Sequence, residues 1–169
     1  MQAAVSRWAE IHRKAAEKYR LGSGSPLQLA SREDTEFLKA CGLSLQVLLD
    51  YVEDFVRTGE PDAGTFSQVA EIRRQYFQEI QKGVPSNQVV NEPDLPLRSD
   101  EWDGIDWLPR ISEKARCFLE GSLCQEVMYG CGGDRAFLRN FHLTLPGFLK
   151  MVRDSGQDRG RILASIRRG

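Results

Sequence analysis

The chain has 169 residues, of which 41% are hydrophobic and 28% charged, a balance typical of a folded globular protein rather than a disordered one. Its formal net charge of −1 produces no overall field that would favour binding to nucleic acid or to an anionic membrane. No apolar run reaches the roughly 18 residues of a membrane span, and residues 1–20 lack the apolar core of a signal peptide. We therefore expect a cytoplasmic protein, not a membrane protein, whose cysteines are reduced thiols.

Four helices are predicted in the first part of the chain. Apolar residues from Trp8 to Tyr19 recur at spacings of three and four, which is typical of an amphipathic helix. Three further helices each open at a hydroxyl side chain that can act as N-cap, at Ser31, Ser44 and Thr65. The residues that mark the ends of these three helices are Gly42, Gly59 and Gly83.

Residues 84–104 predict a connecting segment. Proline occurs three times in this segment, which prevents a regular helix and favours extended chain, and residues 83–90 are a weak strand candidate. The segment is acidic, whereas the chain is basic from Arg135 onward. We expect the two stretches to neutralise each other on the folded surface, and the alternative is a basic patch for an anionic partner.

Four helices are predicted again from residue 105 onward. Asp106 is the candidate N-cap of the first, which would begin at Trp107. The second begins near Asp134, and Thr144 and Asp158 are the candidate N-caps of the third and fourth.

The two helical parts are diverged copies of one unit. Residues 34–54 and 134–154 align without a gap at an offset of 100, and eight of the 21 positions are identical. Background composition would give roughly one or two identical positions. The match continues upstream, where Lys14 pairs with Lys114 at the same offset.

The predicted fold is therefore all-α, with two diverged four-helix repeats packed pseudo-symmetrically into one compact domain. The repeats comprise residues 1–83 and 105–169, joined by the proline-rich acidic linker, and each is too small to bury much apolar surface alone. A residue kept in both copies is expected to serve the shared fold. A residue peculiar to one copy is freer to serve a functional site.

A glycine-rich loop before its second helix distinguishes the second copy. Three glycines surround Cys131 in this loop, whose backbone N–H groups at a helix start can bind an anion or activate a thiol. Basic residues on the preceding helix could reach it, although a tight loop that needs glycine for structural reasons alone is the alternative. The predicted ligand-binding residues are Arg110, Lys114, Arg116, Tyr129, Gly130, Cys131, Gly132, Gly133, Asp134 and Arg135.

Three functions remain open. The first is a binding or adaptor module that presents a cleft near residues 130–135 to a protein or a small anionic ligand. The second is a small enzyme or redox protein with Cys131 as its nucleophile. The third is nucleic-acid association through the basic C-terminal part, whose cations lack interleaved aromatic residues. A zinc site formed by Cys117, Cys124, Cys131 and His142 would lack the C-x₂-C knuckle, so no metal or cofactor is expected.

Several motifs resemble those of a bacterial family of unknown function. They are Trp-Leu-Pro-Arg at 107–110, Lys-Ala-Arg at 114–116 and Tyr-Gly-Cys-Gly-Gly-Asp-Arg-Ala-Phe-Leu at 129–138. The run Asp-Tyr-Val-Glu-Asp-Phe-Val-Arg at 50–57 is similar to a segment of the longer members. The resemblance implies membership of that family but no activity, and it carries no catalytic residue over to this chain.

Overall fold

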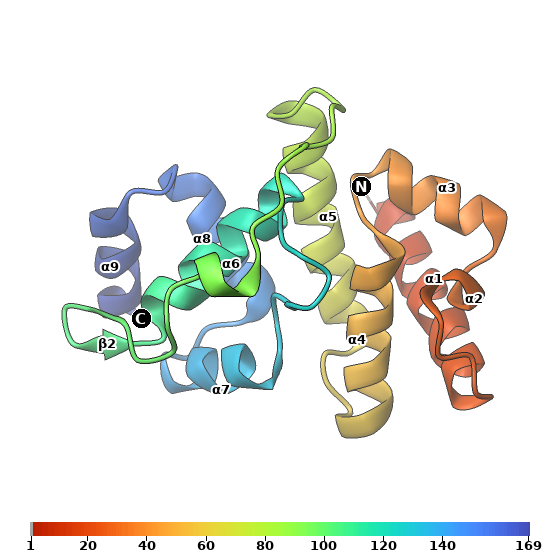
Figure 1. Ribbon diagram of the computed structural model, residues 1–169, viewed down its shortest axis with the longest axis horizontal. Coiled ribbons are helices and arrows are strands. Elements are labelled where there is room, and N and C mark those ends of the chain that lie inside the picture. The colour runs from red at the N-terminus through yellow and green to blue at the C-terminus, as the bar shows by residue number, and fades with distance from the viewer. Residues whose placement is uncertain (1) are drawn as a thin grey trace. The chain divides into compact units, whose positions relative to one another are not determined.

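The computed structural model describes residues 2–169, with side chains described from Arg7 onward. The chain forms two compact units, Met1–Pro85 and Ser86–Gly169, so the boundary falls inside the predicted linker. Figure 1 draws the first unit from red to yellow-green and the second from green to blue. Helices dominate both units, which confirms the all-α prediction. The docking of the two copies into one compact domain stays a prediction.

The first unit contains helices that reproduce the predicted pattern with one addition. They are α1 (Gln2–Arg20), α2 (Pro26–Leu29), α3 (Arg32–Ala40), α4 (Leu45–Thr58) and α5 (Ala63–Glu79). α1 packs against α4 and α5, and its predicted apolar stripe is buried at Trp8, Ile11 and Ala15. The side chains of Ser31 and Ser44 accept N–H bonds from α3 and α4, which confirms both as N-caps.

Two helices of the first unit differ from the prediction. α2, which starts at Pro26, was not predicted because its four residues are too few to show a helical period. α5 starts before the predicted Thr65, since the carboxylate of Asp62 accepts the backbone N–H of Thr65 at 2.8 Å and serves as the N-cap. It also ends at Glu79, ahead of the predicted stop at Gly83.

The aromatic core of the first unit encloses a histidine. His12 is 1% exposed, and its ring lies 5.0 Å from that of Phe55 and 5.4 Å from that of Phe66. Neither ring nitrogen has a hydrogen-bond partner within the described part of the chain. Burial lowers the pKa of His12 to about 4, although the carboxylate of Asp62 opposes the shift. The imidazole is therefore neutral in the folded protein at neutral pH.

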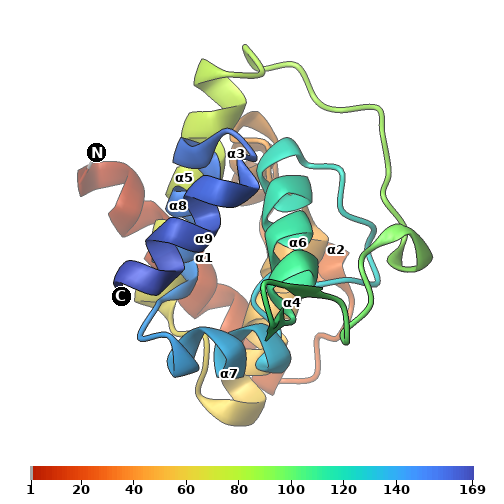
Figure 2. The same cartoon turned by 90° about the vertical axis from the view of Figure 1, so that its left-hand side faces the viewer.

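The second unit follows its predicted helix order. Its elements are η1 (Glu92–Asp94), β1 (Glu101–Trp102), β2 (Ile105–Asp106), α6 (Leu108–Glu120), α7 (Gly132–Asn140), α8 (Leu145–Ser155) and α9 (Arg159–Arg168). α8 packs against α6, α7 and α9. In the rotated view of Figure 2, α9 lies in front of α8. Thr144 and Asp158 accept N–H bonds from the first turns of α8 and α9, which confirms both predicted N-caps.

The entry into α6 differs from the prediction. Asp106 was expected to cap this helix but lies in β2, and Trp107 occupies the N-cap position with a φ of 72° and no side-chain cap bond. The reason is a hairpin that turns at Asp103 and Gly104, both at positive φ. Asp-Gly is a strong hairpin signal, but helical periodicity does not detect it. The weak strand candidate at residues 83–90 forms only an isolated bridge, between Val90 and Leu123.

The sequence repeat recurs in the helix boundaries. α3 and α7 both begin at the same position of the repeat, at Arg32 and Gly132, and α4 and α8 do so at Leu45 and Leu145. The turn after α3 and the turn after α7 each hold a residue in the left-handed region, with φ of 78° at Gly42 and 55° at His142. The pseudo-symmetric packing of the two copies nevertheless stays a prediction.

The acidic linker and the basic C-terminal part meet in the second unit. The carboxylate of Asp103 lies 3.7 Å from Arg159 and 3.3 Å from Arg167. The linker residue Glu92 pairs with Arg110 on α6 at 3.1 Å. The expected neutralisation is thus confirmed at Asp103, whose carboxylate pairs with two of the four arginines of α9.

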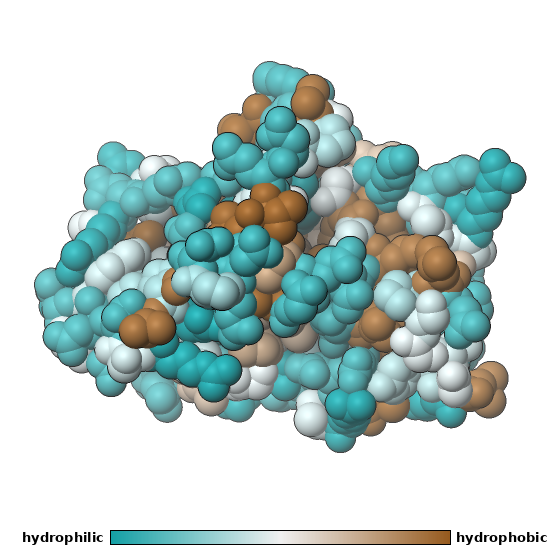
Figure 3. Space-filling model, viewed as in Figure 1, coloured by the Kyte–Doolittle hydropathy of each residue, from teal (hydrophilic) through white to brown (hydrophobic). Residues whose placement is uncertain are grey.

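The surface seen in Figure 3 is mostly hydrophilic, with brown apolar patches between teal side chains. The large apolar side chains exposed in the described part of the chain are Leu21, Leu27, Ile80, Val84, Val89 and Leu97. All of them except Leu27 lie outside helices, so the helices keep their apolar faces inside. No helix in residues 2–169 combines the length and the apolar character needed to cross a membrane.

Candidate functional site

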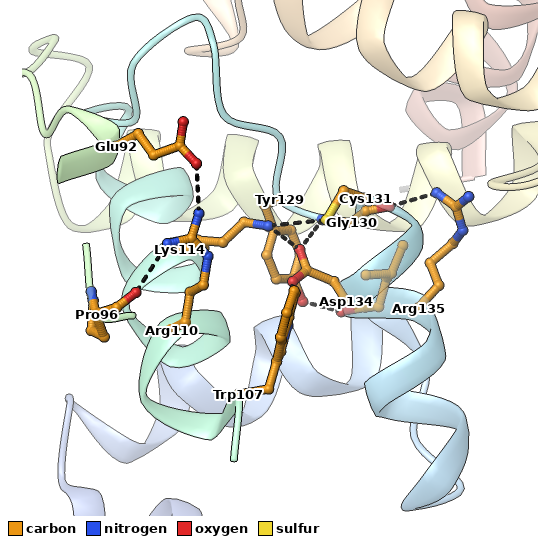
Figure 4. Close-up of polar contacts among 11 residues, drawn as sticks. Glu92, Pro96, Trp107, Arg110, Lys114, Tyr129, Gly130, Cys131, Asp134 and Arg135 are labelled. Carbon is orange, nitrogen blue, oxygen red and sulfur yellow. Dashed lines mark hydrogen bonds and ion pairs between the residues drawn. The ribbon is translucent and has the colours of Figure 1, made fainter. Parts of the chain in front are cut away.

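The glycine-rich loop and α6 meet at a polar centre made of Trp107, Lys114, Gly130, Cys131 and Asp134 (Figure 4). Trp107 and Lys114 come from the start and middle of α6, and the other three come from the loop and the first turn of α7. Lys114 is only 2% exposed and Asp134 is completely buried. Charged side chains are rarely buried to this extent unless they are paired, so the contacts of these two residues decide what the site can do.

Asp134 accepts hydrogen bonds from three donors. Its Oδ1 accepts the indole Nε1–H of Trp107 at 3.0 Å. Its Oδ2 accepts the backbone N–H of Gly130 at 2.8 Å and an N–H of the Lys114 ammonium at 2.5 Å. Gly130 has a φ of 99°, a conformation that glycine adopts without strain. Three donors satisfy a buried carboxylate, so Asp134 has the partners that a buried charge requires.

Cys131 occupies the N-cap position of α7 without capping the helix. Its Sγ instead accepts a hydrogen bond from Nζ of Lys114 at 3.3 Å. Ser31 stands at the equivalent position of the first copy, and its hydroxyl caps α3 by accepting the N–H of Asp34 at 3.1 Å. The sulfur is thus turned toward the lysine in the second copy, where the first copy uses the same position for helix capping.

The exposure of Cys131 separates it from the other cysteines. It is half-buried, whereas Cys41, Cys117 and Cys124 are buried. Burial raises the pKa of Cys117 to about 11, so this thiol stays protonated and unreactive at neutral pH. Cys131 is therefore the cysteine that a small molecule can reach most readily.

The electrostatic surroundings of Cys131 combine one cation, one anion and a helix start. The ammonium of Lys114 donates to both the sulfur and the carboxylate of Asp134. The negative charge of Asp134 is shared among its three donors, and the first turn of α7 adds the partial positive charge of a helix N-terminus. An ammonium donor and a helix N-terminus thus both lie beside the half-buried thiol of Cys131.

Two predicted site residues lie away from the loop, and the expectation that they reach it is wrong. Arg110 donates to the carbonyl oxygen of Pro96 at 2.9 Å and to the carboxylate of Glu92 at 3.1 Å, so it holds the linker. Arg116 pairs with Glu113 on its own helix. It follows Lys114 by two residues, which is a rotation of roughly 200° around a helix, so the two side chains point in opposite directions.

Two other predicted residues support the loop. Tyr129 is buried, and its hydroxyl donates to the carbonyl oxygen of Leu145 at 2.8 Å. Arg135 donates to the carbonyl oxygen of Gly130 at 2.7 Å. The first bond anchors Tyr129 to α8, and the second links α7 back to the loop at Gly130.

The two glycines after Cys131 have different surroundings, which allows a matched pair of substitutions. A Cβ at Gly133 would lie 2.6 Å from Cζ2 of Trp107, whereas a Cβ at Gly132 would have no atom closer than 3.9 Å. We expect Gly133→Ala to lower the free energy of unfolding by about 1–3 kcal/mol, because the indole must move from Asp134. Gly132→Ala should leave it nearly unchanged. Urea denaturation followed by circular dichroism measures both, and equal midpoints would contradict the prediction.

Trp107 is a site residue that sequence reasoning did not select. Trp8 lies near the equivalent position of the first copy, one residue out of register, and its indole donates to Glu71 at 3.3 Å. A tryptophan near the start of both copies was the available signal. The described residues contain no group of three or more His, Cys, Asp or Glu side chains that could hold a metal ion.

Comparisons of the chain with protein-family models, with curated proteins and with solved structures gave no match. The resemblance to a bacterial family therefore stays a prediction. The motifs that carry it, at 107–110, 114–116 and 129–138, supply all five residues of the polar centre.

Proposed function

We propose that this chain is a small thiol protein in which Cys131 reacts with small disulfides and carries the product as a mixed disulfide. The supporting observation is that Sγ of Cys131 accepts a hydrogen bond from the buried ammonium of Lys114 at 3.3 Å. This favours the redox alternative over a ligand cleft at the loop, because the carboxylate of Asp134 is fully buried and already bonded to three donors.

The proposed reaction needs only the small disulfide as oxidant. The deprotonated Sγ of Cys131 attacks one sulfur, a new S–S bond forms as the old one breaks, and the leaving thiolate takes up the proton that Cys131 released. A second small thiol reverses the reaction. Because the other three cysteines are buried, the mechanism uses one cysteine and forms no internal disulfide.

Cys131 occupies the N-cap position of α7 but forms no side-chain cap bond, which is consistent with a functional thiol. A hydroxyl N-cap stabilises a helix by about 1 kcal/mol, and the first copy shows that Ser31 fits this position. Proteins that give up local stability at one position often do so for activity. The proposal includes a reducing compartment such as the cytoplasm, where small thiols would regenerate Cys131.

The test is to treat the native chain with glutathione disulfide at neutral pH and map the products by mass spectrometry. We expect a single glutathione on Cys131. Cys131→Ser should take up none and should be as stable as the wild type or about 1 kcal/mol more stable, because serine can cap α7. Cys124→Ser is the control and should react like the wild type. Modification that is spread over several cysteines, or that spares Cys131, would contradict the proposal.

A further inference from the structure

A hollow of about 530 Å³ lies between α8 and α9 in the second unit. α8 contributes Gly147, Lys150 and Asp154 to its lining, and α9 contributes Arg161, Ser165 and Arg168. These residues follow one another at spacings of three and four, so each helix presents one face to the hollow. Gly147 has no side chain to fill the space.

The cations of the hollow have few partners among the described residues. Lys150 forms no ion pair with the described residues. Arg161 forms a long ion pair with Asp158, at 3.9 Å, and 71% of the Arg161 side chain is exposed. Arg168 donates to the carbonyl oxygen of Ala164 and to the hydroxyl of Ser165, neither of which carries a charge. These three side chains therefore keep their positive charge largely uncompensated.

One carboxylate also lines the hollow. Asp154 pairs with Arg153 at 3.0 Å, so its charge is already balanced by a neighbour on α8. The other two arginines of α9 are different, because Arg159 and Arg167 lie against Asp103. The basic C-terminal part thus has one neutralised side and one side, facing the hollow, with excess positive charge.

The first copy has no counterpart of this lining. At the offset of 100, Lys150 corresponds to Asp50 and Ser155, which also lines the hollow, corresponds to Phe55. The first copy therefore has a carboxylate and an aromatic ring where the second has an ammonium and a small hydroxyl side chain. As at the glycine-rich loop, the residues that differ between the two copies are those that are free to form a site.

We propose that this hollow binds the phosphate group of a small phosphorylated molecule. Arg153 balances Asp154, and Asp158 balances one of the three cations that line the hollow, so an excess of two positive charges remains, which matches a dianionic phosphate. Guanidinium groups bind phosphate oxygens through paired N–H donors. The volume lies within the roughly 300–1,000 Å³ of small-molecule sites. Nucleic acid fits less well, because the described residues that line the hollow include no aromatic side chain for base stacking.

The test is a titration of the full ¹⁵N-labelled chain with inorganic phosphate and with phenyl phosphate, followed by NMR at physiological ionic strength. Both probes should shift the amide signals of Gly147 and Ser165 saturably, and phenyl phosphate should bind at least as tightly. The double variant Lys150→Ala/Arg161→Ala should weaken binding by roughly tenfold or more. Arg32→Ala is the control, because Arg32 lies on α3 with 93% of its side chain exposed.

Several outcomes would overturn the proposal. The first two are amide shifts that grow linearly with phosphate concentration without saturation, and amide shifts that sodium chloride reproduces. The other two are an equal affinity for phosphate in the double variant and the control, and binding of inorganic phosphate without binding of phenyl phosphate. The result does not depend on Cys131, because the substitutions leave the polar centre intact. Failure of this proposal and failure of the thiol function can therefore be told apart.

Discussion

Asp134→Ala is expected to lower the free energy of unfolding by about 3–5 kcal/mol, because it removes the partner of a buried lysine. The ammonium of Lys114, with 3% of its side chain exposed, would lose the carboxylate that lies 2.5 Å away. The indole N–H of Trp107 and the backbone N–H of Gly130 would lose their acceptor as well. Urea denaturation followed by circular dichroism measures the loss.

The sequence repeat supplies the control for this substitution. Asp34 is the counterpart of Asp134, but its carboxylate lies 3.7 Å from Arg7 and 4.0 Å from Lys14, whose side chain is 45% exposed. The side chain of Asp34 is only 12% exposed, but its cationic partners are 35% and 45% exposed, so Asp34→Ala leaves no buried cation without a partner and should cost less than Asp134→Ala. Equal losses for the two variants would contradict the description of Asp134 as the fixed point of the polar centre.

The second large effect is expected on acidification. His12 has an ordinary pKa of 6.5 when the chain is unfolded and about 4 when it is folded. Between pH 4 and 6.5, His12 binds a proton in the unfolded chain but not in the folded one. The contribution of neutral His12 to the free energy of unfolding is therefore fully present above pH 6.5 and is lost as the pH falls toward 4. At about 1.4 kcal/mol per pKa unit, the loss amounts to about 3 kcal/mol. Urea denaturation at a series of pH values measures it.

Asp50, a half-buried acid of the first unit, works in the opposite direction. Burial raises the pKa of Asp50 to about 6, so its contribution to stability is present at low pH and is lost as the pH rises through 6. The His12 contribution is therefore the difference between the wild type and His12→Phe, in which a ring of similar size fills the same aromatic core. His142→Gln, at an exposed histidine, should follow the wild type. Parallel pH curves for the wild type and His12→Phe would show that His12 is not the sensor.

Local capping bonds are the part of the fold that the sequence predicts best. Ser31, Ser44, Thr144 and Asp158 all act as predicted, because a capping side chain and the N–H it accepts are only a few residues apart. Asp106 does not cap α6 as predicted, and the reason is also local in the sequence. A hairpin signal within the preceding five residues outweighs its capping preference and places it in β2.

The candidate site was predicted in part of its membership, since Trp107 was missed and Arg110 and Arg116 lie elsewhere, and its depth was not predicted. The approach of Lys114, Cys131 and Asp134 follows from the loop and the repeat, since their positions flank one helix start. The burial of Lys114 does not follow, because its counterpart Lys14 occupies the same place in the first copy with a largely solvated side chain. The burial of Lys114 depends on how the glycine-rich loop covers α6. Gly130 allows this cover by adopting a positive φ, and Gly133 allows it by letting the ring of Trp107 approach closely.

The reaction rate of Cys131 with glutathione disulfide tests the central claim most directly, when it is measured in the native chain and in the same chain unfolded in urea. A half-buried thiol without activation reacts faster once unfolding exposes it. The contact between Lys114 and Sγ predicts the reverse, a faster reaction at Cys131 in the native chain than in the unfolded one. A slower reaction in the native chain would contradict a functional thiol and leave the polar centre a structural support of the second unit.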